Sequence, residues 1–362
     1  MSDTKRDQDP APPIEQTSVV VVEEAGTAPA GVAAAGAVPA PPAGRGSSLT
    51  DLLANYGVFL FLVLLSVGFS IAQPDQFPTT ENLRVLLGDN AVPGLLALAV
   101  VIPLAAGEFD LSVGATLGFT SILTAQLTIH GTPVGLAILL AVLVGAVVGA
   151  VNAVLVVGIG VNAFIATLAT ATVLSGLNLL VTGGRTLFEG IPDGLKEIAN
   201  SKILGIDLTV YYFLIGALVL WYLLEHTPFG RLLRATGMGR EAARLTGVRT
   251  SSFLAGSFVI AGAIAGLCGA LQLARVGSAT ASMGPEFLLP AYAAAFLGST
   301  TIKRGQFNIW GAVVGTFLLA VGITGLTFAG APFWVPNVFN GGALIIAVSV
   351  AVLVGRRAGD TT

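Results

Sequence analysis

The sequence has few charged residues for its length. Only 10% of its 362 residues are Asp, Glu, Lys or Arg, whereas hydrophobic residues make up 54% and the mean hydropathy is +0.86. A soluble protein carries about 25% charged residues because its surface must be solvated. The deficit indicates that most of this surface faces lipid, and it predicts a multi-pass membrane protein.

The chain is also poor in residues that bind metals or form catalytic centres. Its one cysteine, Cys268, lies inside an apolar run, and its two histidines, His130 and His226, lie at the ends of separate runs. A disulfide framework within the chain is excluded, and we interpret Cys268 as a small buried hydrophobe. We expect no metal site and no catalytic residues, because a membrane-embedded enzyme would need a convergent set of His, Asp or Cys.

Sequence features of nucleotide and nucleic-acid binding are missing too. No G-x-x-x-x-G-K-[ST] phosphate loop occurs, so we do not expect this chain to hydrolyse ATP. After residue 49, 14 basic residues balance 14 acidic ones. This balance gives no reason to expect a nucleic-acid partner.

Residues 1–49 differ in composition from the rest of the chain. They are rich in Ala, Pro, Gly and Val, carry six acids and three bases, and show no helical periodicity. We interpret them as a disordered cytoplasmic tail and not as a secretory signal. The domain prediction is therefore a tail over 1–49, a transmembrane domain over 50–357 and a short C-terminal tail over 358–362.

Ten apolar runs predict the membrane spans of an all-α helix bundle. A helix needs about 20 apolar residues to cross the hydrocarbon core, and two of the runs are shorter than that. The runs cover residues 52–72, 91–106, 110–128, 133–157, 162–181, 207–225, 251–275, 286–299, 306–330 and 338–355.

Glycine pairs with GxxxG spacing occur in four of these runs. Small residues at this spacing let helix backbones approach closely in a membrane, so the pairs indicate a packed bundle and no particular function. They are Gly114/Gly118, Gly145/Gly149, Gly262/Gly266 and Gly311/Gly315.

The basic residues predict an orientation. If ten spans alternate, one side receives nine Lys and Arg residues after the tail and the other receives five. Positive residues favour the cytoplasmic side. Both termini and the 226–250 loop, which alone holds five of the nine, are therefore expected in the cytoplasm.

The loop HTPFGRLLRATGMGREAARLTGVRT at 226–250 carries the first functional candidate. Residues 241–245 favour a short helix, broken by Gly239 before it and Gly247 after it. Such a helix would show Ala242, Ala243 and Leu245 beside charged residues. The loop is either a solvated basic anchor at the membrane face or a docking helix for a cytoplasmic partner.

Two carboxylates lie between apolar runs in the stretch AGEFDLSVG at 106–114. At membrane depth each costs about 2.5–3.5 kcal/mol, so they must lie at an interface, pair, or face water. Asp110 could cap the helix that follows it, with Ser112 as a partner. Alternatively, this helix break lines or gates a solute path.

A third stretch, 161–185, places polar residues within one apolar run. Thr167, Thr170, Ser175 and Asn178 spread over part of one helix surface. They would either form hydrogen bonds between helices or line a hydrophilic route. Farther on, Glu286 could cap a short helix, which we favour, or meet a binding protein outside.

These stretches resemble the ribose-type branch of ATP-binding-cassette (ABC) importer permeases, in the branched-chain amino acid/ribose permease superfamily. The string PFGR, RATG and EAARLTGV over 228–248 resembles the loop through which such permeases couple to their ATPase. GEFDLSVG resembles the family's GGIDLSVG, from which it departs at Glu108 and Phe109. The 161–185 stretch ends in TGGR, and GSTT at 298–301 resembles the family's GGTS-type turn. The resemblance extends over about residues 52–355 and omits the tail.

The resemblance implies roles for individual residues. ATPase coupling would fall to Glu241, Ala242, Ala243 and Gly247, supported by Arg231, Arg234, Arg240 and Arg244. The solute path would include Asp110, Ser112, Asn162, Thr167, Thr170 and Asn178.

The resemblance also implies partners and a mechanism. A cytoplasmic ABC ATPase would hold ATP and Mg²⁺, so this chain would bind no cofactor, and a second permease copy or homologue would complete a dimer in the plasma membrane. A soluble solute-binding protein would dock outside, near residues 73–90 and 182–206. The expected substrate is a ribose-like sugar; permeases for nucleosides or branched-chain amino acids, and an ion-coupled secondary transporter, remain alternatives.

Overall fold

The computed structural model describes residues 49–359, with side-chain surroundings from 56 to 350. The predicted tail over 1–49 lies outside the described residues except for its last residue. Residues 360–362 of the predicted C-terminal tail also lie outside them.

The described chain is mostly helical and its only strands are two residues long, which confirms the predicted all-α class. Ten helices coincide with the ten predicted runs to within a few residues at most ends. They are α1 (Leu49–Ala72), α3 (Ala91–Ala105), α4 (Ser112–Ile129), α5 (Val134–Ala153), α6 (Ala163–Thr182), α8 (Leu208–His226), α11 (Thr250–Val276), α12 (Pro285–Ser299), α13 (Ile309–Phe328) and α14 (Val335–Gly359).

The remaining elements are short. A π-helical turn, η1 (Val154–Ile159), extends α5. The other helices are α2 (Thr80–Asp89), α7 (Asp193–Asn200), α9 (Pro228–Met238) and α10 (Arg240–Leu245), and a two-residue hairpin pairs β1 (Lys202–Ile203) with β2 (Ile206–Asp207) in antiparallel register.

Not every apolar helix is long enough to span a bilayer alone. Six helices in the described part have the required length and hydropathy, and α2 with α3 would make a seventh as a pair bent by 41°. With 15 residues, α12 is about 22 Å long, which is less than the hydrocarbon thickness of about 30 Å. The predicted count of about ten spans is therefore approximate.

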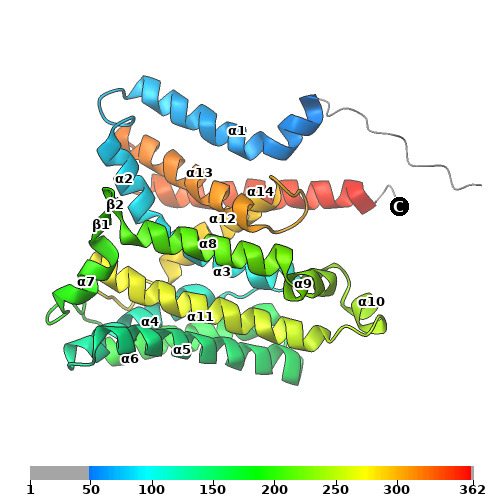
Figure 1. Cartoon of the computed structure of the whole chain (residues 1–362), viewed down its shortest axis with the longest axis horizontal. Helices are drawn as coiled ribbons and strands as arrows, with labels where there is room; N and C mark the ends of the chain where they lie inside the picture. The colour runs from blue at the N-terminus through cyan, green and yellow to red at the C-terminus, as the bar shows by residue number, and fades with distance from the viewer. Residues whose placement is uncertain (1–48, 360–362) are drawn as a thin grey trace, which may run out of the picture. The chain divides into compact units, whose positions relative to one another are not determined.

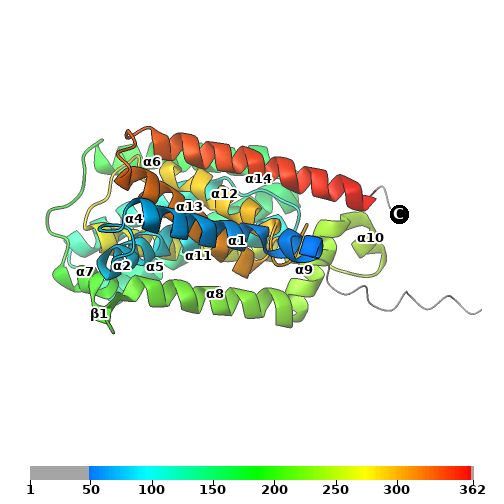
Figure 2. The ribbon, with the colours of Figure 1, turned by 90° about the horizontal axis from the view of Figure 1, so that it is seen from above.

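The long helices lie side by side along one direction (Figures 1 and 2). At one end lie α2, α7 and the β1–β2 hairpin; at the opposite end lie α9, α10, the start of α1 and the end of α14. The start of the first described helix and the end of the last thus lie on the same side as the 226–250 loop, as helix alternation predicts.

Each predicted glycine pair lies at a close helix contact. Gly145 and Gly149 of α5 meet the backbone of α11 at Gly262 and Gly266, and Gly311 and Gly315 of α13 meet the backbone of α12. The fourth pair, on α4, contacts Gly284, where an added Cβ at Gly114 would lie 2.8 Å from the Gly284 carbonyl oxygen. Small residues therefore set the helix spacing, as expected in a membrane bundle.

The segment before α12 enters the bundle as non-helical chain. It leaves α11 at Gly277, which has a φ of +73°, and Ala279 pairs with Leu187 near the α7 end. It then reaches Gly284, packed against Gly114 and Gly118 of α4. As a result, α12 starts partway along the bundle instead of at its surface.

Candidate functional site

The 226–250 loop folds into two helices at one end of the bundle. The Thr227 side chain caps α9 by accepting a hydrogen bond from the Gly230 amide, and Pro228 occupies the first helical position. Gly239 separates α9 from α10, and Gly247, with a φ of +86°, ends the turn after α10. The predicted short helix between two glycines is confirmed.

The exposed face of α10 is partly apolar. Leu245 is 82% exposed and Met238, just before the helix, is 80% exposed. Glu241, Ala242 and Arg244 are also exposed, whereas Ala243 is buried. The expectation that Ala243 shows at the surface is wrong, because its position on this short helix turns it toward the bundle.

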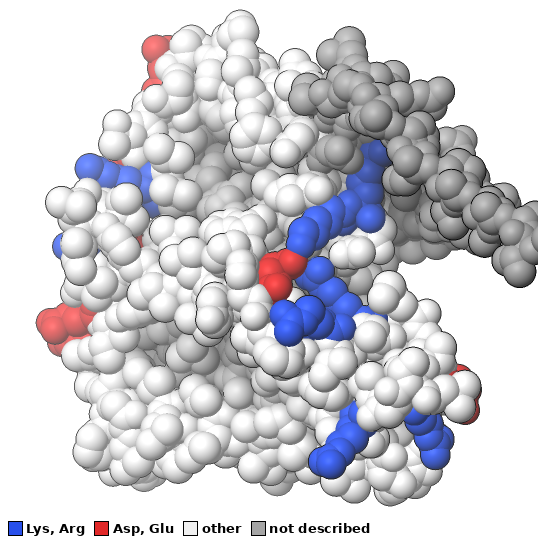
Figure 3. All heavy atoms as spheres, turned by 45° about the vertical axis from the view of Figure 1, so that its right-hand side comes forward, with Lys and Arg blue, Asp and Glu red and all other residues white. Residues whose placement is uncertain are grey.

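The four arginines predicted to support coupling lie in different surroundings. Arg231 and Arg244 are exposed. Arg234 is largely buried and pairs with Glu225, which also pairs with Lys303; we call these three residues the Glu225 triad. Figure 3, which brings this end forward, shows basic side chains gathered around a small acidic area.

Arg240 connects α10 to the turn between α3 and α4. Its guanidinium lies 2.6 Å from the Glu108 carboxylate. In the same turn Gly107 has a φ of +81°, and an added Cβ there would lie 3.3 Å from the Gly237 carbonyl oxygen. Glu108, where the resembled family has glycine, therefore contacts the predicted docking helix.

A buried hydrogen-bond network begins at the next polar residue, Asp110. Its Oδ1 accepts from the Ser112 amide at 3.0 Å and from the Ser112 hydroxyl at 2.6 Å. Asn152 donates to Ser112 Oγ at 2.8 Å, and Thr170 donates to Asn152 Oδ1 at 2.7 Å. We call these four residues the Asp110 network; it joins the start of α4 to α5 and α6.

Two further contacts fix the turn that holds the network. The Asp110 amide donates to the Tyr292 hydroxyl of α12 at 2.9 Å, and the Leu111 amide donates to Thr167 of α6 at 3.0 Å. Asp110 thus accepts hydrogen bonds from Ser112, the first residue of α4, and belongs to a network between helices. Four predicted path residues, Asp110, Ser112, Thr167 and Thr170, lie together.

The other two predicted path residues lie elsewhere on α6. Asn162 is exposed and caps the helix by accepting from the Phe164 and Ile165 amides. Asn178 is fully buried near Gly118, and neither its Nδ2 nor its Oδ1 has a partner among the described residues. A buried unpaired amide is costly and calls for water or a ligand to satisfy it.

Neither Asn152 nor Tyr292 stands out in the sequence as part of this region. Asn152 is an isolated amide side chain in the apolar run 133–157. Tyr292 is an aromatic side chain in the apolar run 286–299. Their partners lie 18 to 182 residues away in the chain. Only the rarity of an amide at membrane depth could have indicated Asn152.

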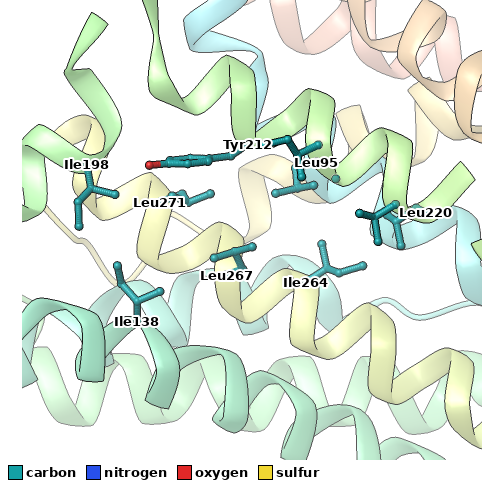
Figure 4. Close-up of a pocket in the computed structure, with 11 residues that line it drawn as sticks. Leu95, Ile138, Ile198, Tyr212, Leu220, Ile264, Leu267 and Leu271 are labelled. Atoms are coloured by element: carbon teal, nitrogen blue, oxygen red, sulfur yellow. The ribbon is translucent and has the colours of Figure 1, made fainter. Parts of the chain in front are cut away.

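One cavity in the described part of the chain does not coincide with any of these residues. It has a volume of about 440 Å³, and its wall is apolar apart from Tyr212 (Figure 4). The lining includes Leu95 of α3, Leu220 of α8 and Leu267 of α11. A polar solute would lose its hydrogen bonds there without replacement, so this cavity is a poor solute site.

Comparison with known proteins identifies the family. The family described as "Branched-chain amino acid transport system / permease component" matches residues 84–348. The ribose import permease protein RbsC of Bacillus subtilis is 33% identical over 307 residues, covering 84% of this chain and 94% of that protein.

Other relatives have similar coverage. The D-allose transport system permease protein AlsC of Escherichia coli is 30% identical, covering 83% of this chain and 93% of that protein. The autoinducer 2 import system permease protein LsrC of Salmonella typhi is 31% identical, covering 83% and 84%. No solved structure matches the chain. From its family match and its bundle of apolar helices, the chain belongs to the permease-component family of branched-chain amino acid transport systems and is a membrane-spanning transport subunit.

Proposed function

We propose that this chain is the permease subunit of an ATP-driven importer for a sugar of monosaccharide size. The observation that carries the coupling part of the proposal is the direct contact between α10 and the α3–α4 turn. Arg240 of α10 pairs with Glu108, and Asp110, two residues later, enters the buried network. A displacement of α10 would therefore be transmitted to the start of α4 through only a few contacts.

In this mechanism an ABC ATPase subunit binds the exposed face of α10. ATP and Mg²⁺ stay on that partner, and closure of its nucleotide-binding dimer moves α10. The motion passes through Glu108 to the turn held by Tyr292 of α12 and Thr167 of α6. Differential binding of the ATPase to two arrangements of the bundle would shift the population from one to the other.

The remaining partners follow from the two ends of the bundle. Basic residues outnumber acidic ones at the α9–α10 end of the described chain, which supports a cytoplasmic location for it. A soluble solute-binding protein would then dock at the α2 and α7 end. A second copy or a homologue would complete the translocation path in the plasma membrane.

A sugar is favoured over the alternative substrates by the relatives. They are named for ribose, D-allose and autoinducer 2, although the family description names branched-chain amino acids. A secondary transporter would need ion-binding groups within its spans. The six long described spans contain two Asp, Glu, Lys or Arg side chains, Glu225 and Arg275. Both form ion pairs.

The test of coupling is the substitution Glu241→Arg. Glu241 is exposed on α10, so its reversal should leave the fold intact and impair ATPase binding. We expect co-purification with the ATPase to fall at least about tenfold, which corresponds to about 1.4 kcal/mol. Solute-stimulated ATP turnover in proteoliposomes should fall with it.

The matched control is Glu197→Arg on α7, an exposed acid at the opposite end. It makes the same charge change and should leave co-purification unaltered. Undiminished association and full ATP turnover in Glu241→Arg would contradict the assignment of α10 as the docking helix.

A further inference from the structure

A second cavity, unlike the apolar one, is rich in polar groups. It lies between α3, α12, α13 and α14 and has a volume of about 290 Å³. Polar groups within a membrane bundle are rare and mark substrate pathways by default. The polar side chains that line this cavity are Asn90, Glu286, Thr316, Asn337 and Asn340.

These side chains converge from four separate segments. Asn90 lies at the bend between α2 and α3, and Glu286 lies in the first turn of α12. Thr316 belongs to α13. Asn337 and Asn340 are three residues apart in α14, so they share one face of that helix. The unusual start of α12 inside the bundle is what brings Glu286 to this cavity; Figure 2 shows α12 between α13 and α14.

Several of these polar groups are available to a ligand. Asn340 Oδ1 is buried and has no hydrogen-bond partner among the described residues. The Glu286 carboxylate has no ion-pair or hydrogen-bond partner in the described part of the chain, and its side chain is exposed to the cavity mouth. A buried polar atom without a partner is costly, so this cavity suits an occupant that can form hydrogen bonds.

The chemistry of the lining points to hydroxyl groups. A carboxylate accepts hydrogen bonds, whereas amides both donate and accept them. Sugar hydroxyls also donate and accept, so they match this mixture. A metal cation would need several oxygen ligands of high charge, and Glu286 is the one carboxylate in the lining.

The size of the cavity narrows the class of solute. Its volume of about 290 Å³ is near the lower limit of ligand pockets, which run from about 300 to 1,000 Å³. A monosaccharide suits this space better than an oligosaccharide. Phe287 and Leu319 line the same cavity, and they offer apolar surface to the C–H groups of a sugar ring.

We propose that this cavity is a binding site for a monosaccharide on its way through the bundle, with Glu286 and the amides of Asn337 and Asn340 receiving its hydroxyls. The proposal rests on the proposed function and names the place where that function recognises its solute. It also gives Glu286 a role other than the helix cap expected from sequence alone.

Uptake by the complete transporter tests the role of Glu286. The permease, its ATPase and its receptor are reconstituted in proteoliposomes, and ATP-dependent uptake of radiolabelled D-ribose is measured. Glu286→Gln and Asn340→Leu should each lower uptake at low D-ribose concentration about tenfold. The first replaces a charged acceptor by a weaker neutral one, and the second removes a hydrogen bond to the sugar.

The control is Thr172→Val, which removes a polar group at an exposed position of α6 outside the cavity and should retain normal uptake. Uptake within twofold of wild type in both cavity variants would overturn the proposal. If the wild-type transporter imports no D-ribose with ATP, the sugar assignment of the proposed function fails instead.

A labelling experiment decides the binding site independently of uptake. Asn337→Cys is treated with a membrane-impermeant thiol reagent, with and without D-ribose; the unmodified chain gives the background, since its Cys268 is buried. We expect labelling that D-ribose slows several-fold. Ile345→Cys, at an exposed apolar position of the same helix, should not be protected. Absence of labelling, or labelling that D-ribose leaves unchanged, would overturn the proposal.

Discussion

The two ends of the bundle each hold a group of three charged residues, and the two groups are opposite in sign. At the α7 end one cation, Arg275, lies between two carboxylates, 2.7 Å from Asp89 and 2.8 Å from Asp207; we call this the Arg275 triad. At the α9 end one carboxylate, Glu225, pairs with two cations in the Glu225 triad.

The helix ends make the two triads unequal. Arg275 lies in the last turn of α11, where a cation is stabilised by the helix dipole. Glu225 is the penultimate residue of α8, where the same dipole disfavours an anion. The Glu225 triad thus needs its two cations to offset an unfavourable position, whereas the Arg275 triad gains from both its acids and its helix. We infer that the Arg275 triad contributes more to the stability of the bundle than the Glu225 triad does.

Removing the central arginine should give the largest loss of stability. Arg275→Leu leaves Asp89 and Asp207 without a cation and removes the hydrogen bond to Asn200. Breaking a buried pair costs about 3–5 kcal/mol; because Asp89 can turn to water, we expect about 2–4 kcal/mol for this variant. The apparent melting temperature, followed by gel filtration of heated samples in detergent, should fall by about 5–10 °C.

Removing the central carboxylate should have a smaller effect. Glu225→Gln keeps an acceptor for Arg234, and Lys303, whose side chain is 46% exposed, can move into solvent. We expect a loss of stability of about 1–2 kcal/mol. The melting temperature should fall by about half as much as in Arg275→Leu. Melting curves of the two variants measured side by side decide the order. A larger decrease in melting temperature for Glu225→Gln would show that the Glu225 triad, and not the Arg275 triad, contributes more to stability.

The pair between Arg240 and Glu108 should matter least for stability. Its side chains are 48% and 23% exposed, and exposed pairs contribute about 0–1 kcal/mol. Glu108→Gln should therefore change the melting temperature by about 2 °C or less. It should nevertheless lower the amount of sugar imported per ATP hydrolysed, because the loss of the charge weakens the contact between α10 and the turn.

Exchange of the two charges is the control for that prediction. In the double variant Glu108→Arg, Arg240→Glu the pair can reform with reversed polarity, and import per ATP should recover at least in part. Unchanged coupling in Glu108→Gln would remove this pair from the proposed mechanism while leaving the docking role of α10 to the Glu241→Arg test.

Hydrophobicity alone predicts most of the bundle, because apolar runs of about 20 residues are typical of membrane-spanning helices. Each of the ten runs became a helix, and the glycine pairs lie where backbones meet. The short helices α2 and α7 went unpredicted: both are polar, and their stability comes from packing that the local sequence does not reveal.

Long-range contacts account for what the sequence left undetermined in the candidate sites. Residues 106–112 and 241–247 can be singled out by their patterns, but no local pattern indicates that Arg240 pairs with Glu108, 132 residues earlier. No local pattern places Glu286 at the polar cavity either. The sequence around it indicates only a helix start, and its position depends on where α12 begins within the bundle. The roles assigned to the coupling and path residues themselves stay predictions.

The contact between α5 and α11 has a consequence for how such a transporter can move. Glycines on both helices meet with backbone against backbone, so no side chain lies between them to change its rotamer and absorb a displacement. The two helices should therefore tilt together as a rigid body. The same kind of contact joins α12 to Gly311 and Gly315 of α13, so these two helices should also move together. Any boundary along which the bundle slides is therefore better placed between the two glycine-packed pairs than within either.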